Sequence, residues 1–177
     1  MKHLSFILVL LMVSVATTAC INNFAVQELN NNAKVYMDKG DVDAAICRLK
    51  SSLELDSAVW ETHYNLATAY FNGEKYKEAQ VEYKEAIKLN PELPDAYFSL
   101  AVAFETEANS LEKLYREENK KLDKEFLDKV VTILNDAIKY YDLYSTKITS
   151  ESEKTETQER IATLKALVAS YLATNEG

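Results

Sequence analysis

Glycine, proline and histidine are scarce in this chain, and their scarcity narrows both the fold and the chemistry. The 177 residues include three glycines, two prolines and two histidines, whereas alanine, leucine, lysine and glutamate are plentiful. Glycine and proline interrupt helices, and the four plentiful residues favour them. The composition therefore predicts an all-α protein.

Motifs for catalysis and metal binding are absent from the sequence. There is no His-Glu-x-x-His pair, no paired-cysteine spacing, no phosphate-binding loop and no nucleophile elbow. His3 lies in an N-terminal segment that resembles a signal, and His63 occupies an aromatic packing position, where a structural role is expected. We therefore expect no catalytic residue, no metal ligand and no cofactor, and a protein that is not an enzyme.

Positive charge is also in deficit. The chain has 28 acidic and 20 basic residues, which gives a formal net charge of -8. A body of this sign is repelled by phosphate backbones and by anionic lipid surfaces. The charge therefore argues against a nucleic-acid partner.

The N-terminal segment has the layout of an export signal. Lys2 precedes the apolar run Leu4–Ala16, and Thr17-Thr18-Ala19 then leads to Cys20. The run is shorter than the roughly 20 residues that span a bilayer as a helix. Small residues before a cysteine resemble the lipobox of bacterial lipoproteins. This resemblance implies removal of residues 1–19 and acylation of Cys20, for example with palmitate, as the first mature residue.

Two other fates of this segment stay open, namely ordinary cleavage before Cys20 with a soluble product, and an uncleaved anchor. All three fates export the rest of the chain. Ile21 follows Cys20, in place of the aspartate that resembles an inner-membrane retention signal. We therefore expect a lipid anchor in the outer membrane of a cell with two membranes.

Cys20 and Cys47 are the only cysteines. If Cys20 is acylated, no disulfide can form within the chain, and Cys47 is expected to be a small, partly buried filler. A Cys20–Cys47 disulfide and a reactive thiol at Cys47 are the alternatives.

A repeating pattern, with a period of about 34 residues, organises the body of the chain. In each period two sets of apolar residues at helical spacing flank a turn, Gly40-Asp41 in the first and Asn72-Gly73 in the second, which predicts a helical hairpin. The period and its content resemble the tetratricopeptide repeat. The resemblance implies a right-handed α-solenoid. The residues that carry it are Ala33, Tyr36, Ala45 and Leu49, then Leu66, Ala67, Tyr70, Ala79, Tyr83, Ala86 and Pro91.

The third repeat is longer than the first two. Its second helix resumes half a period later than the repeat requires, so extra residues are inserted within Glu105–Phe126. The insert keeps helical spacing and contains no glycine or proline, which predicts that both helices are lengthened around a tip near Glu117–Lys121. It is read either as a solvated charged arm or as a contact for a partner.

After the third hairpin, Ser150 and Glu153 form a capping box that opens a last helix. This helix is expected to cap the array and to keep its own outer side polar. The predicted organisation is a signal over 1–19, a tether over 20–27 and a repeat domain over 28–177. The repeats are expected at about 26–59, 60–93 and 94–146, and the capping helix at about 151–173.

The resemblance also implies where a partner binds. In this family the first helices of stacked hairpins line a concave groove that commonly holds an extended peptide or a helix. Tyr64, Phe71 and Phe98 are expected to be exposed rings there. The predicted groove residues are Asn30, Lys34, Met37, Tyr64, Asn65, Thr68, Phe71, Phe98, Ser99 and Val102.

The carboxylate-binding groove of the co-chaperone type does not match. Of its lysine, arginine and asparagine positions only Asn65 has the required residue type, and Asp95 would repel a carboxylate. The groove predicted here is apolar and hydrogen-bonding.

The expected function is a non-catalytic adaptor or scaffold in the bacterial cell envelope. It would bind another protein in the groove and the membrane through its N-terminal lipid. One alternative is a self-assembling structural lipoprotein that uses the elongated hairpin and the C-terminal helix, and another is a regulatory subunit of an envelope enzyme. The partner and the oligomeric state do not follow from the sequence.

The intact mass of the native protein, extracted from membranes, tests the N-terminal prediction. We expect a chain that begins at Cys20 and carries acyl chains. The bare mass of the chain from Cys20 onward, or of the full-length chain, would contradict lipidation and would indicate a soluble exported product or an uncleaved anchor.

Overall fold

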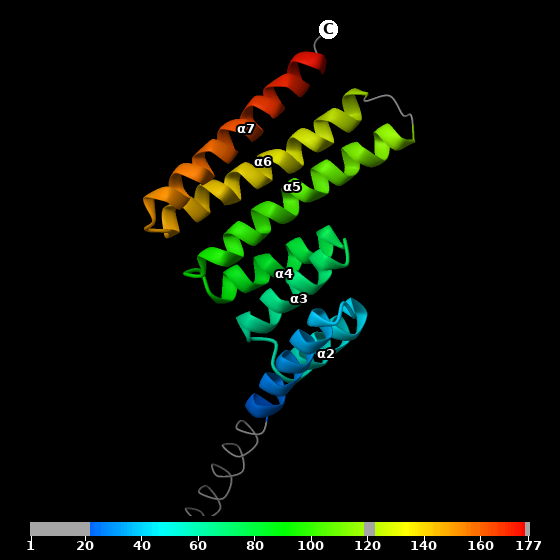
Figure 1. Ribbon diagram of the computed structural model, residues 1–177, viewed down its shortest axis with the longest axis vertical. Coiled ribbons are helices and arrows are strands. Elements are labelled where there is room, and N and C mark those ends of the chain that lie inside the picture. The colour runs from blue at the N-terminus through cyan, green and yellow to red at the C-terminus, as the bar shows by residue number, and fades with distance from the viewer. Residues whose placement is uncertain (1–21, 119–122, 176–177) are drawn as a thin grey trace, which may run out of the picture.

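The computed structural model describes residues 22–118 and 123–175, so the predicted signal, Cys20 and residues 119–121 of the predicted tip lie outside the described residues. Within them the chain forms seven helices and no strand, which confirms the all-α prediction. The first helix covers residues 22–38. The others, labelled in Figure 1, are α2 (Val42–Leu55), α3 (Trp60–Asn72), α4 (Tyr76–Leu89), α5 (Pro94–Glu117), α6 (Lys124–Lys147) and α7 (Glu151–Asn175).

The helices stack in chain order into a solenoid. From α2 onward each helix packs against its neighbours in the sequence, and α3 also contacts α5. Figure 1 shows the resulting array, with the first helix at one end and α7 at the other. The fold is therefore the predicted α-solenoid of helical hairpins, followed by a single C-terminal helix.

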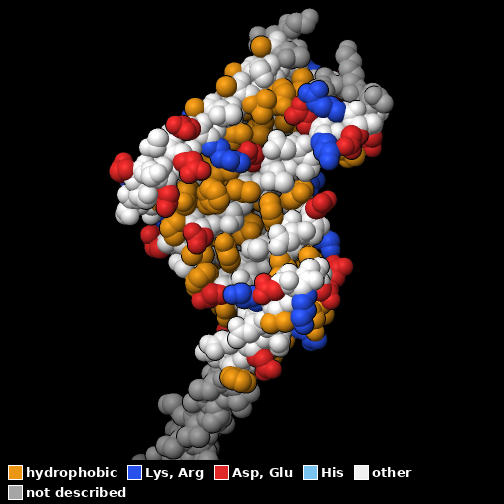
Figure 2. Space-filling view, in the orientation of Figure 1, with side chains coloured by type: hydrophobic (Ala, Val, Ile, Leu, Met, Phe, Trp, Pro, Cys, Tyr) orange, Lys and Arg blue, Asp and Glu red, His pale blue; other side chains and the backbone are white. Residues whose placement is uncertain are grey.

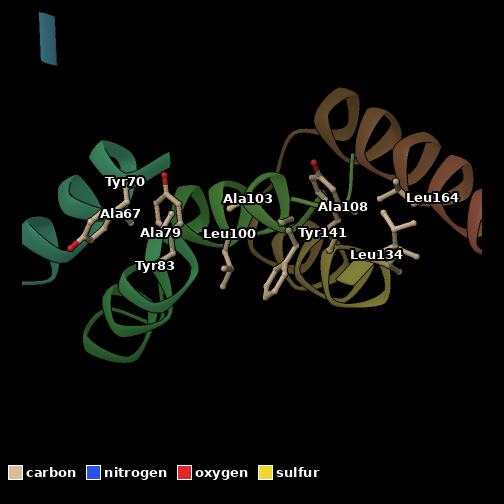
Figure 3. Packing of buried hydrophobic residues seen from close by; sticks show 14 of the residues in the cluster. Ala67, Tyr70, Ala79, Tyr83, Leu100, Ala103, Ala108, Leu134, Tyr141 and Leu164 are labelled. Carbon is tan, nitrogen blue, oxygen red and sulfur yellow. The ribbon is translucent and has the colours of Figure 1, made fainter. Parts of the chain in front are cut away.

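Small residues at the predicted positions let the helices approach one another closely. Ala67 and Ala79 are fully buried, and the rings of Tyr70 and Tyr83 are also buried between the helices. Figure 3 shows these residues in one row that continues through α5 and α6 to Leu164 of α7. A single hydrophobic core therefore runs along the array.

The third hairpin is lengthened as predicted. Helices α5 and α6 contain 24 residues each, whereas α3 contains 13 and α4 contains 14. In the added part the rings of Tyr115 and Phe126 stack with their centroids 3.7 Å apart. The insert therefore continues the apolar seam between the two helices.

The tether predicted over residues 20–27 is wrong for residues 22–27, which are helical. Val26 is buried, and Gln27 donates a hydrogen bond to the side chain of Asn23 one turn earlier. Because Val26 packs into the array, the backbone around it is held in the first helix. The first helix therefore already includes residue 22.

Only half of the predicted capping box forms at the start of α7. The Ser150 hydroxyl accepts from the backbone N–H of Glu153 at 3.4 Å. The Glu153 carboxylate does not reach back to Ser150, because it accepts a hydrogen bond from the hydroxyl of Tyr144 at 3.3 Å. This bond ties the end of α6 to the first turn of α7.

Helix α7 covers the end of the array but lacks a fully polar outer side. Its inner face is buried at Ile161, Leu164, Val168 and Tyr171. Leu172, in the last turns, is 45% exposed. The first turns of the outer side carry charges, and the later turns expose a row of alanines, Ala162, Ala166, Ala169 and Ala173.

Cys47 is exposed, which contradicts the expectation of a partly buried filler. The buried face of α2 is formed by Ala45, Ile46 and Leu49, and Cys47 points away from it.

The turns of the first two repeats have the same backbone, although their residues differ. The amides of Gly40 and Asp41 donate to the carbonyls of Met37 and Tyr36, and the equivalent amides of the second repeat make the same two bonds. Gly40 has a φ of 77°, and its counterpart Glu74 has a φ of 58°. The left-handed residue of the second turn is thus Glu74 and not its neighbour Gly73, which instead leaves room for Val42.

Exchanging residue types at this turn position should move the stability of the two repeats in opposite directions. A left-handed conformation is costly for residues other than glycine, so Glu74→Gly should raise the free energy of unfolding by about 0.5–1 kcal/mol. A Cβ atom at Gly40 would meet nothing within 4 Å. Gly40→Ala should therefore lower the free energy of unfolding by about 1 kcal/mol, solely because alanine is strained at a positive φ. Urea unfolding measures both changes, and shifts of the same sign would contradict this account.

Candidate partner-binding groove

The first helices of the three hairpins present equivalent positions to one side of the array. All ten predicted groove residues line two adjoining hollows there, which share Thr68 and Asn72. The first hollow, of about 460 Å³, includes Asn30, Lys34, Met37, Asn65 and Thr68. The second, of about 260 Å³, includes Tyr64, Thr68, Phe71, Phe98, Ser99 and Val102.

Asn30 holds the floor of the first hollow together. Its amide nitrogen lies 2.9 Å from the carbonyl of Val26, 3.0 Å from the Ser52 hydroxyl and 2.8 Å from the Thr62 hydroxyl. Its carbonyl accepts from the side chain of Asn65 at 3.0 Å. Since Ser52 and Thr62 are fully buried, Asn30 joins the first helix to α2 and α3 and has little capacity left for a partner.

Aromatic and aliphatic side chains form the second hollow. Of the three rings that were expected to be exposed, only Phe98 is, at 40%. Tyr64 is half-buried because its ring packs edge-on against Tyr83, at 5.5 Å between centroids, and its hydroxyl lies 3.3 Å from that of Ser99. Phe71 is half-buried because its ring packs against Tyr76.

The polar atoms under this hollow are paired with one another. The Thr68 hydroxyl donates to the carbonyl of Tyr64. The Tyr83 hydroxyl lies 3.1 Å from the Thr68 hydroxyl. Burial raises the pKa of Tyr83, although the hydrogen bond with Thr68 opposes the rise, so the phenol remains neutral near pH 7. The hollow therefore presents apolar faces to a partner, and the hydroxyls beneath it are already hydrogen-bonded.

Beyond Phe98 the groove continues into a third hollow of about 150 Å³, which α7 closes. The ring of Phe98 lies 5.1 Å from the ring of Tyr144 and 5.8 Å from that of Tyr141. The rings of Tyr140, Tyr141 and Tyr144 all pack against phenylalanines of α5. The third hollow is lined by Phe98, Tyr141, Tyr144, Glu153, Glu156, Thr157 and Arg160.

An ion pair at the side of the third hollow fixes α7 against α5. Arg160 donates two hydrogen bonds to the Glu105 carboxylate, at 2.8 and 3.0 Å, and the Tyr141 hydroxyl donates a third at 2.9 Å. Burial and the Glu105 carboxylate both raise the pKa of Tyr141, so its hydroxyl stays a donor. The charge of Arg160 is thereby matched within the fold.

Carboxylates dominate the rest of this end. Burial raises the pKa of Tyr144, and Glu153, Asp95 and Glu156 raise it further. All three of these acidic residues are exposed. Figure 2 shows hydrophobic side chains gathered over the middle of this face, with carboxylates along the edge where α5 and α7 begin.

Sequence reasoning missed several lining residues. Asn31 and Asn72 line the first hollow, and Tyr83 lines the second. Asn31 stands one repeat before the predicted Asn65, so the repeat offset could have found it. The contribution of α7 had no such signal, because no earlier repeat supplies a counterpart for Glu153 or Arg160.

His63 is held from both sides, in keeping with the structural role expected for it. The imidazole is buried, with Nδ1 2.6 Å from the Glu82 carboxylate, and Nε2 donates to the carbonyl of Ser57 at 3.1 Å. Over residues 22–118 and 123–175, no three acidic, histidine or cysteine side chains are grouped so as to hold a metal ion. No helix in these ranges is both long and apolar enough to cross a membrane.

Stacked helical hairpins with a groove along their first helices define an α-solenoid of short helical repeats. Residues 30–83 match one family model, described as the tetratricopeptide repeat, and residues 68–106 match a second model, described as the TPR repeat. This part of the chain is therefore similar to tetratricopeptide repeats. No curated protein sequence matches the chain significantly.

Solved structures of the same fold extend over most of the chain. The first TPR domain of Spaghetti (RPAP3), bound to the HSP90 peptide SRMEEVD, is 20% identical with a TM-score of 0.59, over 80% of this chain and 93% of that one. The second TPR domain of human RPAP3, in complex with the HSP70 peptide SGPTIEEVD, is 18% identical with a TM-score of 0.58, over 80% of this chain and 98% of that one.

A bacterial protein is similar as well. The Yersinia enterocolitica type III secretion chaperone SycD, in complex with a peptide of the translocator YopD, is 14% identical with a TM-score of 0.55, over 84% of this chain and 92% of that one. At these identities the likeness establishes the fold of the chain and nothing finer.

Two neighbouring asparagines separate structural from surface roles in the groove. Asn30→Ala should lower the free energy of unfolding by about 1–3 kcal/mol, because it removes the partner of buried hydroxyls. Asn31→Ala, the matched control, is exposed and should change it by less than about 0.5 kcal/mol. Urea unfolding measures both, and equal effects would refute the assignment of Asn30 to the floor.

Proposed function

We propose that this protein is a non-catalytic adaptor that binds a segment of another protein in the groove. The observation that carries the proposal is the continuity of the groove. Residues from three successive first helices, spaced by the repeat, line hollows that adjoin at Thr68 and Asn72. The side chains of Asn30, Asn65, Tyr64, Thr68 and Ser99 are hydrogen-bonded within the fold, so a partner meets a largely preformed surface, which lowers the entropic cost of binding.

The similar structures support the class of partner. Spaghetti, human RPAP3 and SycD are each described in complex with a peptide. A linear segment of a partner protein is therefore the ligand that this fold supports best here. The particular peptides of those proteins do not transfer, because their identity to this chain is low.

We further propose that the adaptor works in the cell envelope, held to the outer membrane by a lipid on Cys20. The support is the order of residues 1–20, with one cation, a short apolar run and small residues before the cysteine. The first helix covers residue 22 onward, so an acylated Cys20 would hold the groove close to the membrane surface.

A lysine placed in the groove tests the proposed site. Val102 occupies the repeat position at which the first repeat has Lys34, so the backbone there accepts a lysine. Val102→Lys should reduce partner recovery at least tenfold in affinity capture from crosslinked cells, because it puts a charge in the apolar hollow. Circular dichroism should show an unchanged fold.

Val81→Lys is the matched control. Val81 is 63% exposed on α4 and lines none of the hollows described above, so the same change there should leave capture intact. Proteins captured equally by both variants are bound elsewhere, and if every partner behaves so, the groove is not the site.

A further inference from the structure

The second and third hollows differ in what they offer to a bound segment. The second is apolar and lined by Phe71, Phe98 and Val102, so it favours a large hydrophobic side chain. The third lies next to it, because Phe98 lines both. A segment that occupies one hollow must therefore pass close to the other.

The third hollow presents uncompensated negative charge. Glu153 and Glu156 line it. Besides burial, these two carboxylates and that of Asp95 raise the pKa of Tyr144, which also lines this hollow. Arg160 is the one cation among the described residues that line the second and third hollows. It is bound through two nitrogens to Glu105, whose side chain is 13% exposed, so its charge does not offset the other carboxylates.

The cations nearest in sequence to this end are also engaged. Lys154 pairs with Glu151 at 2.8 Å, and Lys147 pairs with Glu92 at 3.3 Å while its ammonium lies over the ring of Tyr97. Figure 2 shows the same imbalance, since red side chains predominate along the edge where α5 and α7 begin.

We propose that the groove selects a segment that carries a bulky hydrophobic residue and, one helix spacing away, a lysine or arginine. The hydrophobic side chain fills the second hollow, and the cation lies among Glu153, Glu156 and Asp95. This inference rests on the proposed function, because it names the chemistry of the partner for the same groove.

The distance between the two hollows sets the spacing of the two residues. Neighbouring first helices are separated by roughly 10 Å where side chains of ordinary size meet. An extended segment advances about 3.3 Å per residue, so the cation follows or precedes the hydrophobic residue by about three positions. A helical partner needs about seven positions, or two turns.

This polarity is opposite to that of the peptides in two similar structures. SRMEEVD and SGPTIEEVD both end in acidic residues. Acidic tails of this kind would meet like charge at the third hollow of this chain.

A random peptide library, displayed on phage and selected on the purified full chain in detergent, tests the inference. The selected peptides should contain a large hydrophobic residue and a lysine or arginine at the stated spacing. An enriched peptide is then synthesised and titrated by fluorescence anisotropy. Its affinity should fall as salt rises, because exposed charges are screened.

Paired variants assign the effect to the acidic end. Glu153→Gln together with Glu156→Gln should lower the affinity for the synthetic peptide roughly threefold to tenfold and make that affinity less dependent on salt. Glutamine can still accept the hydrogen bond from Tyr144, so the fold is kept. Glu54→Gln together with Glu78→Gln, at exposed sites on α2 and α4 outside the hollows, changes the net charge equally and should have no effect.

The outcomes separate this inference from the function on which it rests. Selected peptides that lack a cation or are acidic, and that Val102→Lys releases, would overturn the charge preference and leave the groove as the site. A selection that yields no peptide sensitive to Val102→Lys would overturn both.

Discussion

Close contact between helices at alanine is the constraint on which the rest of the structure depends. Ala33, Ala67 and Ala101 recur once in each repeat on the first helices, and each is at most 1% exposed. A larger side chain there would push the surrounding helices apart, because protein interiors are packed without spare volume. Since the same small residue is buried in each repeat, the helices can pack alike from repeat to repeat, and the first helices stay in register along one side of the array. The groove is a product of that register.

The repeat period predicted the fold, and the resemblance to the tetratricopeptide repeat implied the ten groove positions, which line two adjoining hollows because equivalent residues of equivalent helices share a face. It could not predict how deeply each side chain sits. Tyr64 and Tyr83 lie on different helices of one hairpin. Their edge-on contact, which half-buries Tyr64, depends on how the two helices pack and not on the repeat pattern. The same holds for the start of the domain, where Val26 packs against the array and keeps residues 22–27 helical. Glu153 and Arg160 belong to a helix without a repeat counterpart, so no offset could assign them to the groove.

One backbone frame carries a changing set of side chains along the groove. At a single repeat position the residue passes from Asn30 to Tyr64 to Phe98, and at another from Lys34 to Thr68 to Val102. The first end is therefore rich in amides, the middle is apolar, and the last end, beside α7, is acidic. Such a gradient gives a bound chain a direction as well as a place, because reversing it would bring its cation to the wrong end.

The long α5 helix connects the groove to the far end of the third hairpin. Its first turns carry Phe98 and Val102, and its last turns pack Tyr115 against Phe126 of α6. About 28 Å of unbroken helix separates Phe98 from Glu117 at 1.5 Å per residue. A rotation of α5 by about 5° at the groove therefore displaces its far end by about 2.5 Å. A partner bound in the groove could in this way shift the far end of α5, because one continuous helix connects the two.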